Sequence, residues 1–243
     1  MGRIVFAATM IAIGIMGLVQ GGFAPIWTPP LKHWPDRGAI ALATSLVSLA
    51  GGLGMLRRRW LPFAAGGLGV VLVLWMLAAK GPPLLAAPTS AVAWESLGET
   101  AVLAAAAIVL AGRRWPARIL YGGSLLAFGW SHLAYLKATA GLVPAWLPGR
   151  QALAELTGAT YLAAGAAVLT GVLARPAAML VAVQIGLFTL LVWGPQVGSG
   201  APSADAWSEF VISASLTAAG WAIAESYGAA RWPRLPGLRR RVV

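Results

Sequence analysis

Two histidines and a few carboxylates are the side chains of this 243-residue chain that could carry out acid–base chemistry. His33 lies in a segment rich in Trp and Pro, whereas His132 lies inside an apolar stretch. An ionisable side chain in such a stretch is costly to bury and is often kept for a function. His132 is therefore a candidate for a proton relay or for a contact with a quinone carbonyl. A hydrogen bond to a neighbouring helix would explain the same residue without any ligand.

The carboxylates lie mostly near one end of the predicted helices. A helix start favours negative charge through its dipole, which explains three of them without a further role: Glu95, Glu155 and Glu209. Glu99 lies almost two turns inside its helix, so its burial would require a partner. Lys80, Lys137 and His132 are expected at the same end and are the candidates for that partner.

The strongest candidate site for a ligand or a proton relay combines these groups with aromatic side chains expected at the same end of the molecule. It comprises His132, Glu99, Trp130, Tyr135 and Trp146. Gln184 and Glu209 are secondary candidates, although an interhelical hydrogen bond explains a mid-helix Gln184 better than a ligand does. We assign no catalytic residue, and whether the chain is an enzyme stays open.

Several kinds of chemistry are excluded or disfavoured by the residue types. The chain has no cysteine, which excludes disulfides, thiol nucleophiles and iron–sulfur ligation by this chain. The carboxylates and the single buried histidine do not form a spaced metal-ligand set. A haem held by two histidines would need both rings inside the helices, so haem is disfavoured and the cofactor stays open.

The composition is that of an integral membrane protein. Hydrophobic residues make up 59% of the chain and charged residues 10%, with a mean hydropathy of +0.77. Soluble domains carry roughly 25% charged residues, so a soluble globular enzyme and a disordered chain are both excluded. The net charge of +11 comes from short basic clusters between apolar runs, which is typical of cytoplasmic loops. Membrane lipid is therefore the expected partner, and nucleic acid is not.

Eight apolar segments are each close to the roughly 20 residues that a membrane-spanning helix needs. They cover residues 3–22, 38–56, 61–79, 91–112, 118–137, 151–173, 175–195 and 206–226. Because Lys and Arg concentrate on the side of the N-terminus, both termini are expected in the cytoplasm. We expect a multi-pass protein of a bacterial cytoplasmic (inner) membrane, with a basic tail at 229–243 that touches anionic lipid.

The two halves of the chain resemble each other at a nearly constant offset. At an offset of 115 residues, the matches are Arg3 with Arg118, Ile4 with Ile119 and Gly14 with Gly129. At an offset of 113 residues, they are Arg37 with Arg150, Thr44 with Thr157, Gly52 with Gly165, Gly81-Pro82 with Gly194-Pro195 and Trp94 with Trp207. The expected units are 1–114 and 115–228. Since each has four spans, we expect two tandem four-helix bundles related by a pseudo-twofold axis along the membrane normal.

The second unit resembles the DoxX-like family of membrane proteins. The resemblance lies in Gly129-Trp130-Ser131-His132, Val143-Pro144-Ala145-Trp146-Leu147-Pro148, Leu156-Thr157-Gly158 and Ala174-Arg175. It implies a four-helix unit and quinone-linked redox chemistry carried out with a partner protein. Two positions depart from the family pattern. Gly17 stands in the first unit where His132 stands in the second, and the neighbourhood of Tyr161 lacks the family's glutamate.

Three hypotheses follow for the function. The first is a DoxX-like subunit that supports quinone-linked redox chemistry with a redox partner, and it requires an apolar pocket with one or two polar ends. The second is a permease for a small solute with its path at the interface of the repeats, which requires a continuous polar path. The third is a structural or assembly role, which requires neither.

Overall fold

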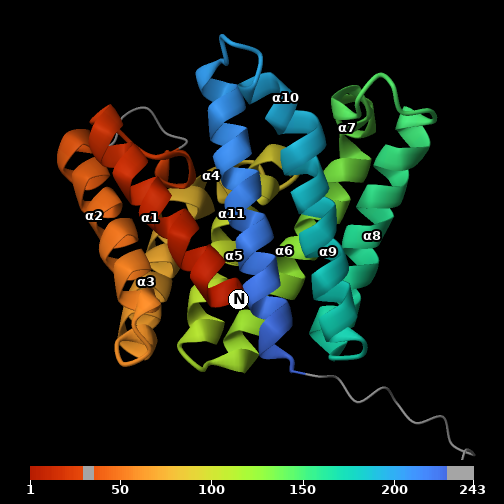
Figure 1. Ribbon diagram of the computed structural model, residues 1–243. Coiled ribbons are helices and arrows are strands. Elements are labelled where there is room, and N and C mark those ends of the chain that lie inside the picture. Colours follow the sequence, from red (N-terminus) through yellow and green to blue (C-terminus); the bar gives the residue numbers. More distant parts are fainter. Residues whose placement is uncertain (30–35, 229–243) are drawn as a thin grey trace, which may run out of the picture.

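The computed structural model describes residues 1–29 and 36–228, and all the regular elements in these ranges are helices (Figure 1). His33 and the tail 229–243 lie outside the described residues. Eight long helices lie close to the eight predicted segments: α1 (Gly2–Gln20), α2 (Arg37–Leu56), α3 (Leu61–Trp75), α5 (Ala91–Leu110), α6 (Arg114–Ala134), α8 (Arg150–Thr170), α9 (Ala174–Phe188) and α11 (Ala204–Ser226). The shorter elements are η1 (Pro25–Trp27), η2 (Met76–Lys80), α4 (Gly81–Ala86), α7 (Leu136–Leu142), η3 (Thr189–Trp193) and α10 (Gly194–Val197).

Six helical segments of the described chain are long and apolar enough to cross a membrane. They are α1, α2, α3 continued through α4, α5, α8, and α9 continued through α10. The remaining long helices, α6 and α11, are more polar: α6 carries Arg118 and His132, and α11 carries Asp205 and Glu209. Each packs against several other helices. The architecture agrees with the prediction of an all-α, multi-pass membrane protein.

Glycine residues allow α1 and α2 to pack at very short range. A Cβ atom added to Gly14 would lie 2.7 Å from the backbone nitrogen of Leu49, and one added to Gly52 would lie 2.8 Å from the carbonyl oxygen of Ala7. Such contacts leave no space for any side chain at the two glycines. Close backbone approach of this kind is how helices associate where lipid provides no hydrophobic drive.

The contact between α6 and α8 is built in the same way. A Cβ atom added to Gly129 would lie 2.8 Å from the carbonyl oxygen of Gly158, and one added to Gly165 would lie 2.9 Å from that of Gly122. Gly129 and Gly165 are the residues that match Gly14 and Gly52 in the sequence. The matched glycines thus make matched helix contacts in the two halves of the chain.

A π-helical turn interrupts the third long helix of each half. In the first half it is η2, between α3 and α4, and in the second half it is η3, between α9 and α10. In each turn the N–H of a glycine donates to the carbonyl five residues before it, Gly81 to Met76 and Gly194 to Thr189. A proline follows each glycine; its ring lacks an N–H and conflicts with the carbonyl four residues earlier, and the wider turn relieves that conflict.

The two halves of the chain are joined by contacts among four helices. α1 packs against α11, α6 packs against α5, and α5 and α11 pack against each other. Figure 1 shows α11 between α1 and α9, with the short helices α4, α7 and α10 near one end of the molecule. Helices α5 and α11 therefore form the centre of the fold.

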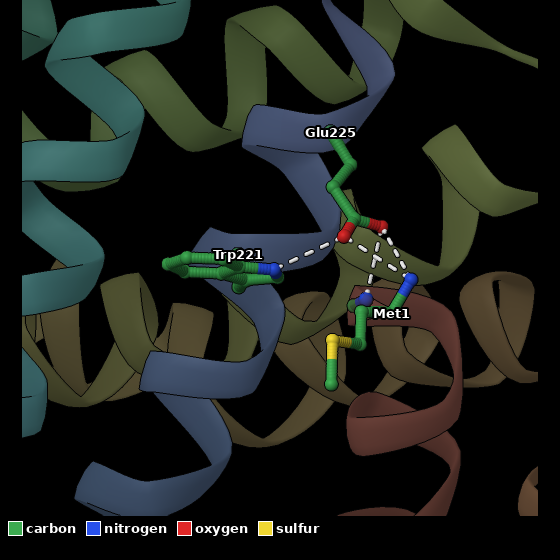
Figure 2. A network of polar contacts seen from close by, with 4 residues as sticks. Met1, Trp221 and Glu225 are labelled. Carbon is green, nitrogen blue, oxygen red and sulfur yellow. Dashed lines mark hydrogen bonds and ion pairs between the residues drawn. The ribbon is translucent and has the colours of Figure 1, made fainter.

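A polar network fastens the start of α1 to the end of α11 (Figure 2). The Glu225 carboxylate accepts hydrogen bonds from the backbone N–H of Gly2 at 2.9 Å and from Nε1 of Trp221 at 3.0 Å. The amino group of Met1 lies 3.1 Å from Oε1 of the same carboxylate. Gly2 is required here because an added Cβ atom would lie 2.7 Å from the Cα atom of Ala222.

Candidate functional site

The ring of His132 lies in an aromatic environment between α6, α8 and α9. It meets the ring of Tyr161 edge-on, with 5.0 Å between centroids, and stacks on the ring of Phe188 at 6.2 Å and 16°. His132 is half-buried and Tyr161 is buried. Two other helices of the second half therefore supply the aromatic walls around the imidazole ring that α6 carries.

One nitrogen of His132 is fixed by the backbone of its own helix. Nδ1 lies 2.9 Å from the carbonyl oxygen of Phe128, one turn earlier in α6. Because a carbonyl oxygen can only accept, Nδ1 carries the proton in this hydrogen bond. In the neutral ring, Nε2 is then the atom able to accept a hydrogen bond, and a second proton on Nε2 would make it a donor.

Gln184 adds an amide group to the same region. Its Nε2 donates to the carbonyl oxygen of Thr157 at 3.3 Å, which links α9 to α8, and the amide also interacts with the hydroxyl of Tyr161. The sequence suggested an interhelical hydrogen bond for Gln184, and this contact has that form. The site around His132 thus combines an imidazole, a phenol and an amide within aromatic walls.

The carboxylates gather on the two central helices. Glu95 and Glu99 lie one turn apart on the same face of α5, and Glu209 projects from α11. All three side chains are half-buried, and Glu99 interacts electrostatically with the other two and with Lys80.

Lys80 lies in the π-helical turn η2 and is buried, with 7% of its surface exposed. Its Nζ donates to the carbonyl oxygen of Thr28 at 2.8 Å, which ties the turn to the segment after α1. Of the partners proposed for Glu99, Lys80 interacts with it electrostatically, whereas Lys137 is exposed and His132 packs against Tyr161 and Phe188.

Tyr161 packs against rings carried by α6. It meets the ring of His132 edge-on. The ring of Phe128 fills the space beside it, with 5.6 Å between the two centroids, and packs against Gly98 of α5. The phenol therefore lies in an aromatic cluster together with the imidazole.

The three aromatic residues expected at the site are at the surface instead. Trp130, Tyr135 and Trp146 are 40%, 45% and 70% exposed. Exposed tryptophan and tyrosine near helix ends are typical of the aromatic belt at a membrane surface. The structure thus places His132 and Gln184 next to the same residue, Tyr161, and Glu99 interacts electrostatically with Glu209, but the three aromatic side chains lie outside the packed region.

Tyr161 and Phe188 are parts of the site that the sequence did not indicate. Tyr161 lies one turn after Gly158, a glycine that contacts α6, and this spacing places the phenol on the face of α8 that meets His132. Phe188 carries no such signal, because an apolar residue in an apolar helix is the expected background.

The first half of the chain fills the corresponding space differently. Trp27 donates from Nε1 to Oγ of Ser48 at 2.7 Å and meets the ring of Trp75 edge-on at 5.6 Å. Ser48 and Trp75 precede Tyr161 and Phe188 by 113 residues. An indole from the segment after α1 thus lies where the second half has an imidazole on the helix itself.

The described residues form no metal-binding cluster, and the comparisons identify no relative of the chain. Among residues 1–29 and 36–228, no three His, Asp or Glu side chains are placed to hold a metal ion. Comparisons with protein-family models, with curated proteins and with solved structures give no match to the chain.

Proposed function

We propose that this chain is a DoxX-like membrane subunit that binds the ring of a quinone next to His132 and supports quinone-linked redox chemistry with a partner protein. The observation that carries the proposal is the setting of His132. Its Nδ1 is held by the carbonyl of Phe128, its ring stacks on Phe188, and Tyr161 and Gln184 lie beside it.

These groups fit the chemistry of a quinone. A flat apolar ring can stack among aromatic side chains, and its two oxygens need hydrogen-bonding groups at the edge of the ring. Nε2 of neutral His132 can accept the proton of a quinol hydroxyl as the partner protein takes up the electrons, and the protonated imidazole can donate it to a quinone oxygen as the partner supplies electrons. Tyr161, which packs edge-on against His132, brings a phenol to the same region.

The proposal includes the finer topology. We infer eight spans, with α6 and α11 also crossing the membrane, and two four-helix units related by a pseudo-twofold axis along the membrane normal. Matched glycine contacts, matched π-helical turns and the α5–α11 contact at the centre support this relation. The positive charge near the ends of the chain supports cytoplasmic termini in a bacterial inner membrane.

A second candidate function is a permease for a small cationic solute. Glu95, Glu99 and Glu209 favour it, because they interact on the two helices that meet between the halves of the chain. Carboxylates inside a membrane protein often mark an ion or proton path. Under this alternative, Glu99→Gln would stop solute flux into liposomes, whereas His132→Phe would leave the flux unchanged.

The quinone site is tested by binding of a short-chain quinone to the purified protein. We expect His132→Phe, which keeps a ring but loses both nitrogens, to weaken binding about tenfold, the loss expected from one hydrogen bond of about 1.4 kcal/mol. Tyr135→Phe is the matched control, because Tyr135 is an exposed aromatic residue near the same end of α6. Equal affinity of His132→Phe and the wild type would refute the site.

A further inference from the structure

A groove with a volume of about 680 Å³ runs along the outer face of α2 and α3, on helices that do not supply the site around His132. Its walls are apolar and include Gly51 and Gly54 of α2 and Gly67 of α3, with Phe63 at its edge. Arg59 and Trp60, in the turn that joins the two helices, line it at that end. The volume is within the range of small-molecule sites, roughly 300–1,000 Å³.

The groove is open where one glycine of α3 lacks a side chain. The two helices touch near their common turn, where a Cβ atom added to Gly54 would lie 2.6 Å from Cβ of Ala64. Gly67 lies one turn further along α3, and an added Cβ atom there would meet nothing within 4 Å. The floor of the groove is therefore open at Gly67.

The corresponding face of α8 and α9 has a different composition. Ala164, Ala167 and Leu180 follow Gly51, Gly54 and Gly67 by 113 residues, and Val172 follows Arg59 at the same offset. Of the three glycines, Gly67 is the one with open space around it, and Leu180 places a side chain at the matched position of the second half. Val172 is apolar where Arg59 is charged. The open part of the groove at Gly67 and the positive charge of Arg59 therefore occur together, in the first half of the chain.

The charge at the end of the groove indicates its occupant. Arg57, Arg58 and Arg59 are consecutive and exposed, and Trp60 beside them is 57% exposed. Tryptophan is typical of the depth of lipid head groups, and arginine clusters just outside a membrane-spanning helix attract anionic lipids. A chain of methylene groups would fill the apolar part of the groove, with a phosphate at its basic end.

We propose that the groove between α2 and α3 is a specific binding site for one anionic phospholipid, with an acyl chain against Gly51, Gly54 and Gly67 and the phosphate held by Arg59. The site is distinct from the proposed quinone site, so either can be refuted without the other. It also gives the first half of the chain a role that does not depend on a histidine.

The test is the amount of lipid that the full-length protein retains after purification from vesicles of equal parts phosphatidylglycerol and phosphatidylcholine. We expect the wild type to retain phosphatidylglycerol selectively. Gly67→Leu, which introduces the residue found at position 180, should abolish this selectivity. Arg59→Gln should weaken retention about fivefold, the factor for loss of one basic residue near an anionic head group.

Two matched variants control for general effects. Gly123→Leu places the same side chain on an exposed face of α6 with no atom within 4 Å, and Arg114→Gln removes an exposed arginine at the start of α6. Both should retain phosphatidylglycerol as the wild type does. Equal retention of the two lipids by the wild type, or loss of retention in the controls, would overturn the proposal. Retention of a quinone in the groove in place of the lipid would also overturn it.

Discussion

His132 owes its position to its own helix and its surroundings to two others. The hydrogen bond from Nδ1 to Phe128 fixes the ring on α6, while Tyr161 and Phe188 come from α8 and α9. A histidine placed this way can exchange a proton at Nε2 without moving, because the other nitrogen is already bound. This is why the residue fits a ligand with oxygen atoms at the edge of a ring.

Tyr121 provides a test of side-chain packing at the centre of the fold. Its hydroxyl is buried beside Gly220 and has no hydrogen-bond partner among the described residues. Since a buried polar group without a partner is destabilising, we expect Tyr121→Phe to stabilise the protein by about 1 kcal/mol. Thermal unfolding in detergent measures the effect as a higher Tm.

The matched variant is Tyr161→Phe, which should lower Tm because the phenol of Tyr161 interacts with Gln184. A lower Tm for Tyr121→Phe would show instead that its hydroxyl is satisfied.

At this scale the sequence predicted part of the site. An ionisable residue in an apolar stretch stands out, so His132, Glu99 and Gln184 were found as candidates. The sequence did not indicate that Trp130 and Tyr135 point outward. Neighbouring residues of α6 point in different directions, so a step of one residue separates a packed face from a lipid-facing one. The rotation of α6 is set by the glycines on the other face of the helix, which pack against α8.

Glycine contacts decide how the helices of each half pack. Gly14 belongs to the α1–α2 interface, and its missing side chain lets the two backbones meet. Gly123 also lies in a long helix, but on an exposed face with nothing within 4 Å. The two residues therefore allow the same substitution to be tested in opposite environments.

We expect Gly14→Ala and Gly123→Ala to change stability in opposite directions. At Gly14 the new methyl group would force α1 and α2 apart, at a cost of about 1–3 kcal/mol. At Gly123 it would meet no neighbour and would stabilise the helix by roughly 0.5–1 kcal/mol through the lower entropy of the unfolded chain. Thermal unfolding of both variants measures the difference. A shift of Tm in the same direction for Gly14→Ala and Gly123→Ala would contradict the packing described for α1 and α2.

The sequence predicted the long helices within a few residues but not their interruptions. The pairs Gly81-Pro82 and Gly194-Pro195 were identified as matches between the halves, yet the π-helical turns before them were not foreseen. A proline inside a helix can cause a kink, a break or a wider turn, and tertiary packing selects among these. The short helix α7, Leu136–Leu142, was also not predicted.

The helices of the two halves meet through α1, α5, α6 and α11. This arrangement places α5 and α11, which carry the carboxylates, at the centre and leaves α2, α3, α8 and α9 on either side. The sequence predicted an interface between the halves from the repeat. It could not identify the helices that form it, because several faces of Gly- and Ala-rich helices are able to pack closely.

The proposed topology can be tested with single cysteines, because the natural chain has none. Ser199 lies between α10 and α11, and Arg113 lies just before α6; both are exposed. With cytoplasmic termini, we expect a membrane-impermeant maleimide to label Ser199→Cys in intact cells. Arg113→Cys should react only after the membrane is opened. The reverse pattern would invert the proposed orientation, and labelling of both in intact cells would contradict the number of spans.

The most direct test of the proposed function is mass spectrometry of the small molecules that remain bound to the gently solubilised protein, together with its absorption spectrum. We predict a bound quinone in the wild type and its loss in His132→Phe, with Tyr135→Phe unchanged. A wild-type preparation that carries phospholipid but no quinone would contradict the redox role and would move the search to solute transport or assembly.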